Sequence, residues 1–245
     1  MDKTFISGSP REEAATPMTV WHEVEDALEA IIQDYIRVNH YISLFQDDKA
    51  RLTGLRKAGH QTGTALELGS GPGNFTKMLE PIVDGQIVCL DYSDKMIAHA
   101  KKSRNGNRVH HIRGIFERLP IRTGAITLAG AAYALRDSTD KPRTYSEIGR
   151  ALKPGGRLIV IDIGKPDNPI IRGVFSLYMK HIVPIIAGLA TEHGHRNPWS
   201  ILYQTYELLP PNKDLQHLIE TKIGPTETNE LALGGLIVAS ADKRD

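Results

Sequence analysis

A glycine-rich segment, Gly69-Ser70-Gly71-Pro72-Gly73, lies directly between a short apolar run and a stretch with helical periodicity. Glycine permits tight turns and lets a ligand approach the backbone without meeting a Cβ atom. In a doubly wound sheet, such a turn lies at the carboxyl ends of the strands, where ligands bind. The dinucleotide fingerprint would place a third glycine where this chain has Asn74. A plain strand-to-helix turn is the alternative interpretation.

An acidic residue, Asp91, ends the next apolar run, Ile87-Val88-Cys89-Leu90. A carboxylate at this place can accept hydrogen bonds from both ribose hydroxyls of an adenosine. An exposed acid at a strand end is the alternative, and the preceding glycine loop makes it the weaker one. Loop and acid together indicate a cofactor that contains adenosine, and they leave a nicotinamide dinucleotide and S-adenosylmethionine open.

A parallel sheet is needed to bring these residues together. Short apolar runs alternate with amphipathic helical stretches, which predicts crossover units on a parallel sheet. Two further runs near the C-terminus are so close that we expect an antiparallel hairpin. The fold class is therefore α/β, with a doubly wound, mostly parallel, seven-stranded Rossmann-like sheet. Its predicted strands lie near 64–68, 86–90, 108–112, 125–133, 157–163, 223–231 and 234–240, and its helices near 74–83, 94–103, 140–152 and 213–221.

The rest of the chain divides by composition. Residues 1–18 are polar and broken by prolines, which predicts a mobile arm, and residues 19–60 predict a helical cap with a second helix at 43–58. Residues 61–245 form the main domain. After the fifth strand, residues 165–212 combine many prolines with apolar helical pieces, which predicts a helical insertion.

Composition limits the class of protein. The 245 residues carry 30 Lys and Arg against 29 Asp and Glu, a net charge of +1, which argues against a nucleic-acid partner. The 40% of hydrophobic residues excludes a disordered chain. The single cysteine, Cys89, rules out an internal disulfide and suits a reducing compartment. No signal peptide is visible, and the apolar patch 182–190 is far shorter than the ~20 residues of a spanning helix. We expect a soluble cytoplasmic protein.

Three segments resemble the ordered signature of class I S-adenosylmethionine-dependent methyltransferases. More narrowly, four segments are similar to motifs of the ubiquinone/menaquinone-biosynthesis (UbiE-type) C-methyltransferase family, over about residues 19–240. The first set comprises Glu-Leu-Gly-Ser-Gly-Pro-Gly-Asn at 67–74, Leu-Asp-Tyr-Ser-Asp-Lys-Met at 90–96 and Leu-Lys-Pro-Gly-Gly-Arg-Leu at 152–158. The second comprises the residues from Tyr35 through Asn39 to Ser43, Leu-Arg-Asp-Ser-Thr-Asp at 135–140, the run at 150–158 and the stretch from Asp162 to Pro169.

The resemblance implies S-adenosylmethionine as cofactor and S-adenosylhomocysteine as product. One departure concerns adenine, because Ile115 stands where the family usually has an aspartate and cannot accept a hydrogen bond from the adenine amino group. We expect the Phe116 backbone amide and packing to hold adenine instead. The implied cofactor-binding residues are Glu67, Gly69, Ser70, Gly71, Gly73, Asn74, Asp91, Tyr92, Met96, Ile115, Phe116 and Ala132.

The resemblance also implies catalytic residues, namely Arg136, Asp137 and Tyr35. Methylation of a hydroquinone ring carbon requires removal of a proton from the neighbouring hydroxyl, which raises electron density on the carbon. Arg136 would stabilise the phenolate or order a water, and Asp137, where the family has asparagine, could accept the proton. An Arg–Asp surface pair is the alternative. Tyr35 and Asn39 lie on one helical face, and the resemblance places them over the acceptor; simple core packing of Tyr35 is the alternative.

The insertion is expected to contact the acceptor. Its run 170–190 holds Arg172, Lys180 and His181 but no acid. The resemblance places it over the acceptor pocket, with Phe175, Tyr178 and Met179 as substrate-binding residues beside Leu177 and Ile182. Arg172 and Lys180 would face anionic lipid in weak peripheral membrane contact. Packing of the whole run on the sheet as extra core is the alternative.

Further partners are few. His193-Gly194-His195 could suggest a metal, but no carboxylate motif accompanies it, so we predict a loop and no metal. A homodimer is compatible with the sequence, which does not fix the oligomeric state.

The leading interpretation is a methyltransferase of a demethylated menaquinone- or ubiquinone-type hydroquinone. Alternatives are methylation of another small molecule at oxygen, nitrogen or carbon, and a non-catalytic cofactor-binding regulator. A nicotinamide-dependent oxidoreductase is disfavoured by Asn74 and by the absence of a Tyr-x-x-x-Lys pair.

Overall fold

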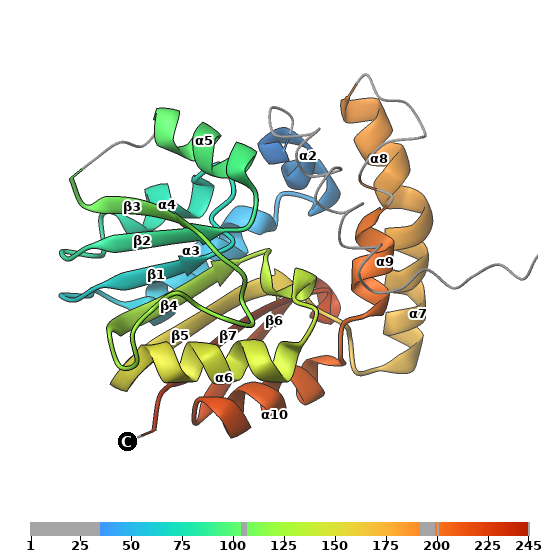
Figure 1. Cartoon of the computed structure of the whole chain (residues 1–245). Helices are drawn as coiled ribbons and strands as arrows, with labels where there is room; N and C mark the ends of the chain where they lie inside the picture. Colours follow the sequence, from blue (N-terminus) through green and yellow to red (C-terminus); the bar gives the residue numbers. More distant parts are fainter. Residues whose placement is uncertain (1–34, 104–106, 192–198, 200, 245) are drawn as a thin grey trace, which may run out of the picture.

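Seven strands form one sheet in the order β3-β2-β1-β4-β5-β7-β6, seen in a computed structural model that describes residues 35–103, 107–191, 199 and 201–244 (Figure 1). Strands β1 to β5 are parallel, and β7 is antiparallel to β5 and β6. This confirms the predicted fold class, including the C-terminal hairpin. The order reverses between β1 and β4, which is where a doubly wound sheet binds its ligand. The strands are β1 (Ala65–Leu68), β2 (Ile87–Asp91), β3 (Val109–Arg113), β4 (Ile126–Ala132), β5 (Leu152–Ile163), β6 (Thr226–Leu231) and β7 (Leu236–Asp242).

Helices cover both faces of the sheet. Side chains alternate along each strand, so Leu66 and Leu68 of β1 face one layer while Ala65 faces the other. The first layer contains α6 (Lys141–Ala151) and α10 (Asn212–Lys222), and the second contains α3 (Asp47–Ala58) and α4 (Asn74–Leu79). Helix α5 (Asp94–Ser103) packs against β2 and β3.

The N-terminal helices depart in one detail from the prediction. The described part begins with α2 (Tyr35–Ile42), and the next helix, α3, starts at Asp47 rather than at residue 43. Leu44 and Phe45 have φ angles of 51° and 61°, in the left-handed region, so the chain turns sharply between the two helices. The predicted arm 1–18 and the predicted helix start at Thr19 lie outside the described residues.

The insertion forms one continuous helical rod, not separate pieces. It consists of α7 (Pro169–Leu177), a π-helical turn (Tyr178–Ile182) and α8 (Val183–Ala190), followed by α9 (Ile201–Glu207). Proline lacks a backbone N–H, and a π-turn ahead of Pro184 accommodates the missing helical hydrogen bond without ending the rod. Figure 1 shows α2, α7, α8 and α9 together at one end of the sheet.

This rod, Pro169–Ala190, is also long and apolar enough to cross a membrane by length and composition, with a mean hydropathy of 1.5 in its most apolar window. The prediction of an apolar patch at 182–190 alone was too short, because Pro184 signals a break in the sequence whereas the helix continues through it. One side of the rod packs with α2 and α9 in a separate hydrophobic cluster around Met179, Val183, Trp199 and Tyr206. A spanning orientation would remove these side chains from their protein partners.

Candidate functional site

The glycine loop between β1 and α4 binds directly to the end of β2. Three glycines of the loop are left-handed, and a Cβ on Gly69 would lie 2.4 Å from the Ala134 Cβ. The Gly71 N–H donates to Asp91 Oδ2 at 2.7 Å, and the Ser93 N–H donates to Asp91 Oδ1 at 2.9 Å. The carboxylate of Asp91 is therefore fixed at the edge of the loop.

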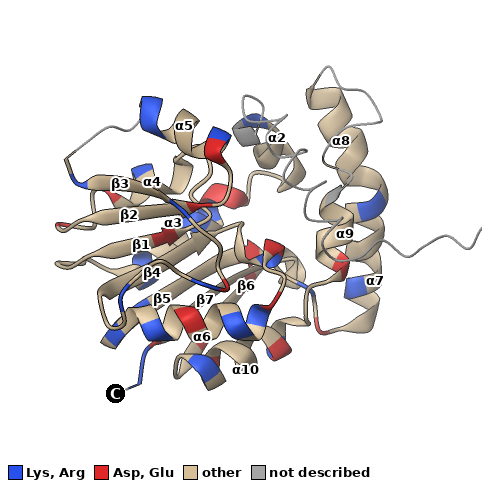
Figure 2. Cartoon of the chain, viewed as in Figure 1, with Lys and Arg blue, Asp and Glu red and all other residues tan. Residues whose placement is uncertain are grey.

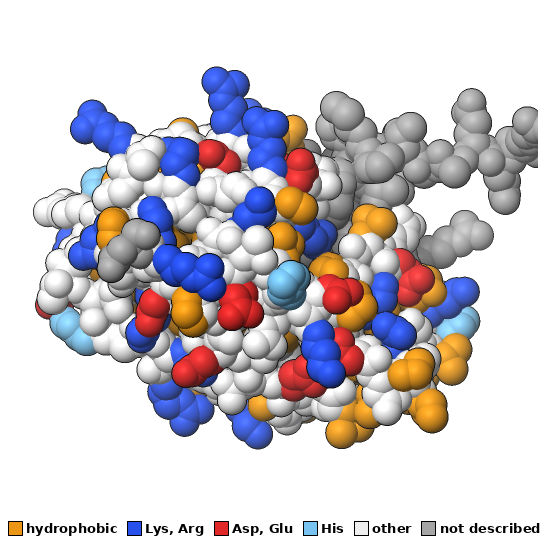
Figure 3. All heavy atoms as spheres, turned by 90° about the horizontal axis from the view of Figure 1, so that it is seen from below, with side chains coloured by type: hydrophobic (Ala, Val, Ile, Leu, Met, Phe, Trp, Pro, Cys, Tyr) orange, Lys and Arg blue, Asp and Glu red, His pale blue; other side chains and the backbone are white. Residues whose placement is uncertain are grey.

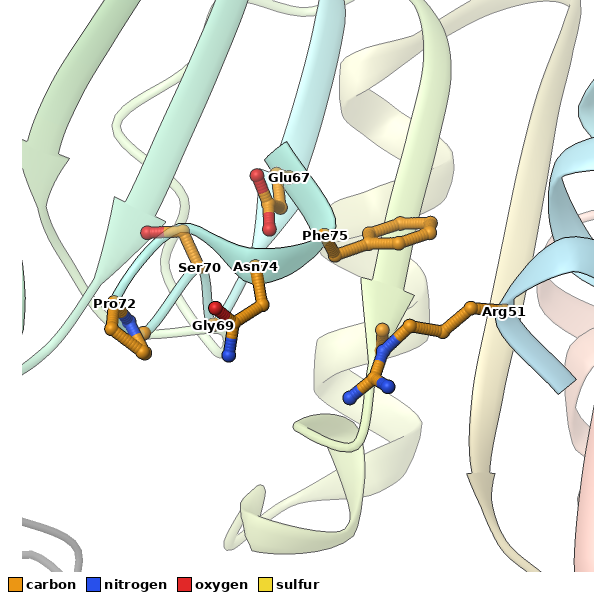
Figure 4. A pocket seen from close by; sticks show the side chains of 9 residues that line it. Arg51, Glu67, Gly69, Ser70, Pro72, Asn74 and Phe75 are labelled. Carbon is orange, nitrogen blue, oxygen red and sulfur yellow. The ribbon is translucent and has the colours of Figure 1, made fainter. Parts of the chain in front are cut away.

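A pocket opens over this loop (Figure 4). A Cβ on Gly71 would meet nothing within 4 Å, so a ligand can reach this backbone closely. The Ser70 hydroxyl lines the same pocket; it is buried and has no hydrogen-bond partner among the described residues. A buried polar atom of this kind needs a partner, which a polar ligand would supply. The lining consists of Arg51, Glu67, Gly69, Ser70, Gly71, Pro72, Asn74, Phe75 and Ala132.

Six predicted cofactor-binding residues thus lie together in the pocket lining, and Gly73 is the N-cap of α4 beside them.

One of these six residues, Glu67, is a fully buried acid. Its Oε2 accepts a hydrogen bond from Thr76 Oγ1 at 2.5 Å, and the Cys89 thiol lies 3.6 Å away. Burial raises the pKa of Glu67 to about 7, more than the Thr76 hydrogen bond lowers it. The carboxyl therefore titrates near neutral pH.

The four remaining predicted cofactor residues follow β2 and β3 and are not part of this lining. Tyr92 is exposed beneath the Arg113 guanidinium, which lies 5.2 Å from its ring centroid, whereas Met96 is buried in α5. Ile115 is 45% exposed. The Phe116 ring reaches within 3.3 Å of a Cβ built on Gly69, so it borders the loop from the β3 side.

Arg136 and Asp137 follow the end of β4 in a short 3-10 turn, Leu135–Asp137. Arg136 is buried, and its Nη1 lies 3.4 Å from Asp162 Oδ1 and donates to the Tyr133 carbonyl. Its Nε lies 3.3 Å from Asp137 Oδ1. The guanidinium is thus held between two carboxylates. Asp162, the penultimate residue of β5, completes this cluster, and the sequence analysis did not select it.

Asp137 has an unusual acidity. Burial raises its pKa to about 6, against the opposing effect of the Arg136 charge, and the negative charge of Asp162 raises it further. The side chain retains 18% exposure, so it is not sealed from a ligand. At pH 7 the carboxylate is mostly ionised and can accept a proton.

The predicted acceptor-binding residues lie on the helices beyond the sheet. Tyr35 begins α2, but its side chain is outside the described part, and Asn39 is half-buried on the same helix. Met179 is buried, while Phe175 and Tyr178 pack beside it and stack with ring centroids 6.0 Å apart. The Tyr178 hydroxyl donates to the Ile42 carbonyl at 2.8 Å. These three residues join the insertion to α2 and do not line the pocket described above.

Arg51 is a pocket residue that the sequence analysis missed. Its Nη1 pairs with Asp47 Oδ2 at 2.8 Å and with Asp48 Oδ1 at 3.1 Å, and His40 Nδ1 lies 2.8 Å from Asp47 Oδ1. The spacing of four residues between Asp47 and Arg51 indicates a helical ion pair. This spacing predicts the ion pair, but it does not predict that the Arg51 side chain lines the pocket over the glycine loop.

His40, Asp47 and Asp48 also form a group with ligand atoms close enough for a metal ion. The Arg51 guanidinium already pairs with both carboxylates, so a cation there would have to displace it. His193 and His195, the other candidate ligands, lie outside the described residues.

Comparison with known proteins agrees with this geometry. Residues 18–241 match the ubiE/COQ5 methyltransferase family. The demethylmenaquinone methyltransferase of Lactococcus lactis is 30% identical over 223 residues, which cover 89% of this chain and 87% of the relative. The demethylmenaquinone methyltransferase of Staphylococcus haemolyticus is 27% identical over 203 residues, which cover 81% of this chain and 84% of the relative.

Solved structures show the same fold at low identity. A SAM-dependent methyltransferase of Thermotoga maritima has a TM-score of 0.62 at 19% identity, covering 92% of this chain and 100% of that one. A SAM-dependent methyltransferase of Aquifex aeolicus has a TM-score of 0.55 at 14% identity, covering 94% and 100%.

Proposed function

Because the chain belongs to the ubiE/COQ5 methyltransferase family and is therefore an S-adenosylmethionine-dependent methyltransferase, we propose that its acceptor is a ring carbon of a demethylated, menaquinone-type hydroquinone. The observation that carries this proposal is the buried Arg136, which pairs with Asp137 in the turn that follows β4, the strand whose last residue, Ala132, lines the loop pocket. Two relatives whose names specify demethylmenaquinone as the substrate support the choice of acceptor.

The pocket fits the cofactor. The left-handed glycine loop, the open space at Gly71 and the Ser70 hydroxyl, which has no partner in the described part of the chain, suit a polar ligand laid against the backbone. In this proposal Asp91 holds the ribose, and Phe116, Tyr92, Met96 and Ile115 contact the adenine side of the cofactor. When bound, S-adenosylmethionine supplies an electrophilic methyl group, so this chain must position and activate the acceptor.

Asp137 is the proposed proton acceptor. Loss of a proton from the acceptor hydroxyl raises electron density on the adjacent ring carbon, and a general base must lie within reach of that proton. With a pKa of about 6, Asp137 is ionised at neutral pH yet still basic enough to take a proton. Arg136, whose guanidinium pairs with Asp137 and Asp162, is a positioning residue in this scheme.

The helices beyond the sheet would cover the acceptor. Tyr35 and Asn39 lie one turn apart on α2, which packs against α8. The insertion is held against α2 in the hydrophobic cluster by Phe175, Tyr178 and Met179. We propose that these side chains form one wall of the acceptor site.

The exposed side of the insertion supports the proposal that the protein is cytoplasmic and makes peripheral contact with a membrane. Large apolar side chains recur at helical spacing along the rod and are open to solvent, and Figure 2 shows little charge on α7 and α8. Figure 3 shows hydrophobic side chains gathered at the edge of the molecule where α7 lies. Arg172, Lys180 and His181 supply positive charge, and residues 170–190 contain no acid, which suits an anionic lipid surface. The exposed residues are Ile170, Val174, Leu177, Ile182, Ile185 and Leu189.

The test of the acceptor is transfer of labelled methyl groups. Purified protein is incubated with the labelled donor and a panel of reduced demethylated quinones that differ in ring and in tail length. We expect label in the ring carbon of the naphthoquinol. Label in no quinone, together with label in another class of small molecule, would contradict the proposed acceptor and leave the methyltransferase assignment intact.

A further inference from the structure

A basic side chain lines one end of the pocket, and the glycine loop and Asp91 do not explain its place there. Arg51 reaches the pocket from α3, on a segment that precedes the sheet in the chain, and Figure 4 shows its side chain extending toward the loop. Its guanidinium also lies 4.9 Å from the centroid of the Tyr133 ring, and Tyr133 directly follows the lining residue Ala132. Arg51 therefore lies on the side of the pocket next to β4.

The strand order shows which part of the cofactor meets this side. Adjacent strands end in the order β3, β2, β1 and β4. Phe116 follows β3 and Asp91 ends β2, which assigns adenine and ribose to that half of the site. The methionine part must then extend across β1 toward β4. It carries a carboxylate and an ammonium group, and the same lining offers one basic and one acidic side chain, Arg51 and Glu67.

We propose that Arg51 binds the carboxylate of the methionine part of the cofactor, with Asp47 as its positioning residue. A guanidinium presents several N–H donors in a planar fork that suits a carboxylate. The proposal rests on the cofactor site described under the proposed function and adds the residue that recognises the amino-acid end.

Asp47 is well suited to hold Arg51 still. It is buried, and its Oδ1 accepts hydrogen bonds from His40 Nδ1 at 2.8 Å and Ser43 Oγ at 3.0 Å, while its Oδ2 pairs with Arg51. Although burial raises its pKa, the hydrogen bonds from His40 and Arg51 hold the pKa of Asp47 below its usual value. The carboxylate thus stays charged at neutral pH and fixes the long Arg51 side chain, which lowers the entropy lost on binding.

The test compares two ligands that differ only in the carboxylate. Calorimetry measures the affinity of wild type, Arg51→Met and Arg51→Lys for S-adenosylmethionine and for decarboxylated S-adenosylmethionine, with no acceptor present. We expect Arg51→Met to weaken S-adenosylmethionine binding by about tenfold or more, since a charge-assisted hydrogen bond is lost. Binding of the decarboxylated ligand should change by less than about twofold, and Arg51→Lys should restore part of the loss.

Two controls make the result specific. Arg56→Met removes an arginine from the same helix outside the pocket lining and should leave both affinities unchanged. Asp47→Asn should weaken S-adenosylmethionine binding more than binding of the decarboxylated ligand, which a general loss of stability would not do. Equal losses for both ligands in Arg51→Met, or none, would overturn the proposal. A wild type that binds neither ligand would instead count against the cofactor site itself.

Discussion

Arg136 holds both oxygens of the buried Asp162 carboxylate: its backbone N–H donates to Oδ2 at 3.0 Å, and its Nη1 lies 3.4 Å from Oδ1. The turn after β4 is thereby fixed to the end of β5. Because the same guanidinium pairs with Asp137, the protein places its proposed base by burying an arginine between two acids.

The first prediction concerns this buried pair. Arg136→Met leaves Asp162 without its partner charge, and an unpaired buried charge costs about 3–5 kcal/mol of unfolding free energy. Urea denaturation should show this loss. The double variant with Asp162→Asn should lose less than the sum of the two single losses, because the two residues interact. Arg113→Met, which breaks the exposed pair with Asp94, should cost less than about 1 kcal/mol.

The second prediction is a pH profile of turnover. A base must be deprotonated to act, so activity should fall as pH drops through about 6, the pKa of Asp137. Asp137→Asn should lower turnover by about a hundredfold or more and remove this acid limb. Asp140→Asn, at the exposed N-cap of α6, serves as the neighbouring control. Full turnover with an unchanged limb in Asp137→Asn would assign the proton to water instead.

The third prediction concerns Glu67 and the stability of the protein without cofactor. Burial raises its pKa from 4.5 to about 7, so the folded state binds more protons than the unfolded state between these values. The free energy of unfolding should therefore fall by about 3 kcal/mol as pH rises from about 4.5 to 7. Glu67→Gln should lack this contribution, so its stability relative to wild type should increase over the same range.

Urea titrations of wild type and Glu67→Gln at pH 5 and pH 8 measure this difference. Glu227→Gln, with an exposed carboxyl, should follow wild type at both pH values. Parallel curves for wild type and Glu67→Gln would show that Glu67 is not the titrating group.

The fourth prediction concerns Asp91. Its two oxygens anchor the glycine loop and the Ser93 backbone, so Asp91→Asn should disturb the loop as well as the ribose contacts. We expect S-adenosylhomocysteine to bind about tenfold more weakly or worse, since a hydrogen bond to a charged group is worth about 1.5–3 kcal/mol. Asp94→Asn, on the exposed pair with Arg113, should bind as wild type does. Calorimetry that finds equal affinity for Asp91→Asn and wild type would contradict the assignment.

These residues also show how far the sequence predicts the site. Gly69, Gly71 and Asp91 were predictable because local chemistry reveals them: a left-handed turn needs glycine, and an acid at a strand end meets the neighbouring loop. The sheet followed from the alternation of apolar runs and helices. Arg51 was not predictable in the same way, since its place depends on how α3 packs on the sheet.

Two further features required the structure. Asp162 reads in the sequence as an acid within an apolar strand, and only its pairing with Arg136 shows why its burial is tolerated. The rod Pro169–Ala190 contains Pro184, which in sequence signals a break, whereas a π-turn allows the helix to continue. Tertiary packing against α2 and α9 decided both the length of the rod and which of its side chains are buried.

The fifth prediction concerns membrane contact by the exposed side of this rod. Val174 and Leu177 are 65% and 61% exposed, and each apolar side chain moved from water into lipid contributes about 25 cal/mol per Å². Attraction of Arg172 and Lys180 to anionic lipid adds about 1 kcal/mol each near the surface. We expect wild type to float with anionic vesicles at low salt and to be released as salt is raised.

The double variant Val174→Ser/Leu177→Ser should lose most of this flotation while keeping its affinity for S-adenosylhomocysteine. Its turnover should drop on long-tailed quinones in vesicles but not on tail-less analogues in solution, because only the former require the surface. Leu52→Ser, at an exposed apolar position on α3, is the matched control and should float as wild type does. If Leu52→Ser lost as much flotation as the double variant, the membrane contact would not be specific to the exposed side of the rod. Wild type that does not float but sediments as a dimer, which the double variant converts to a monomer, would assign the exposed side to a second copy of this chain.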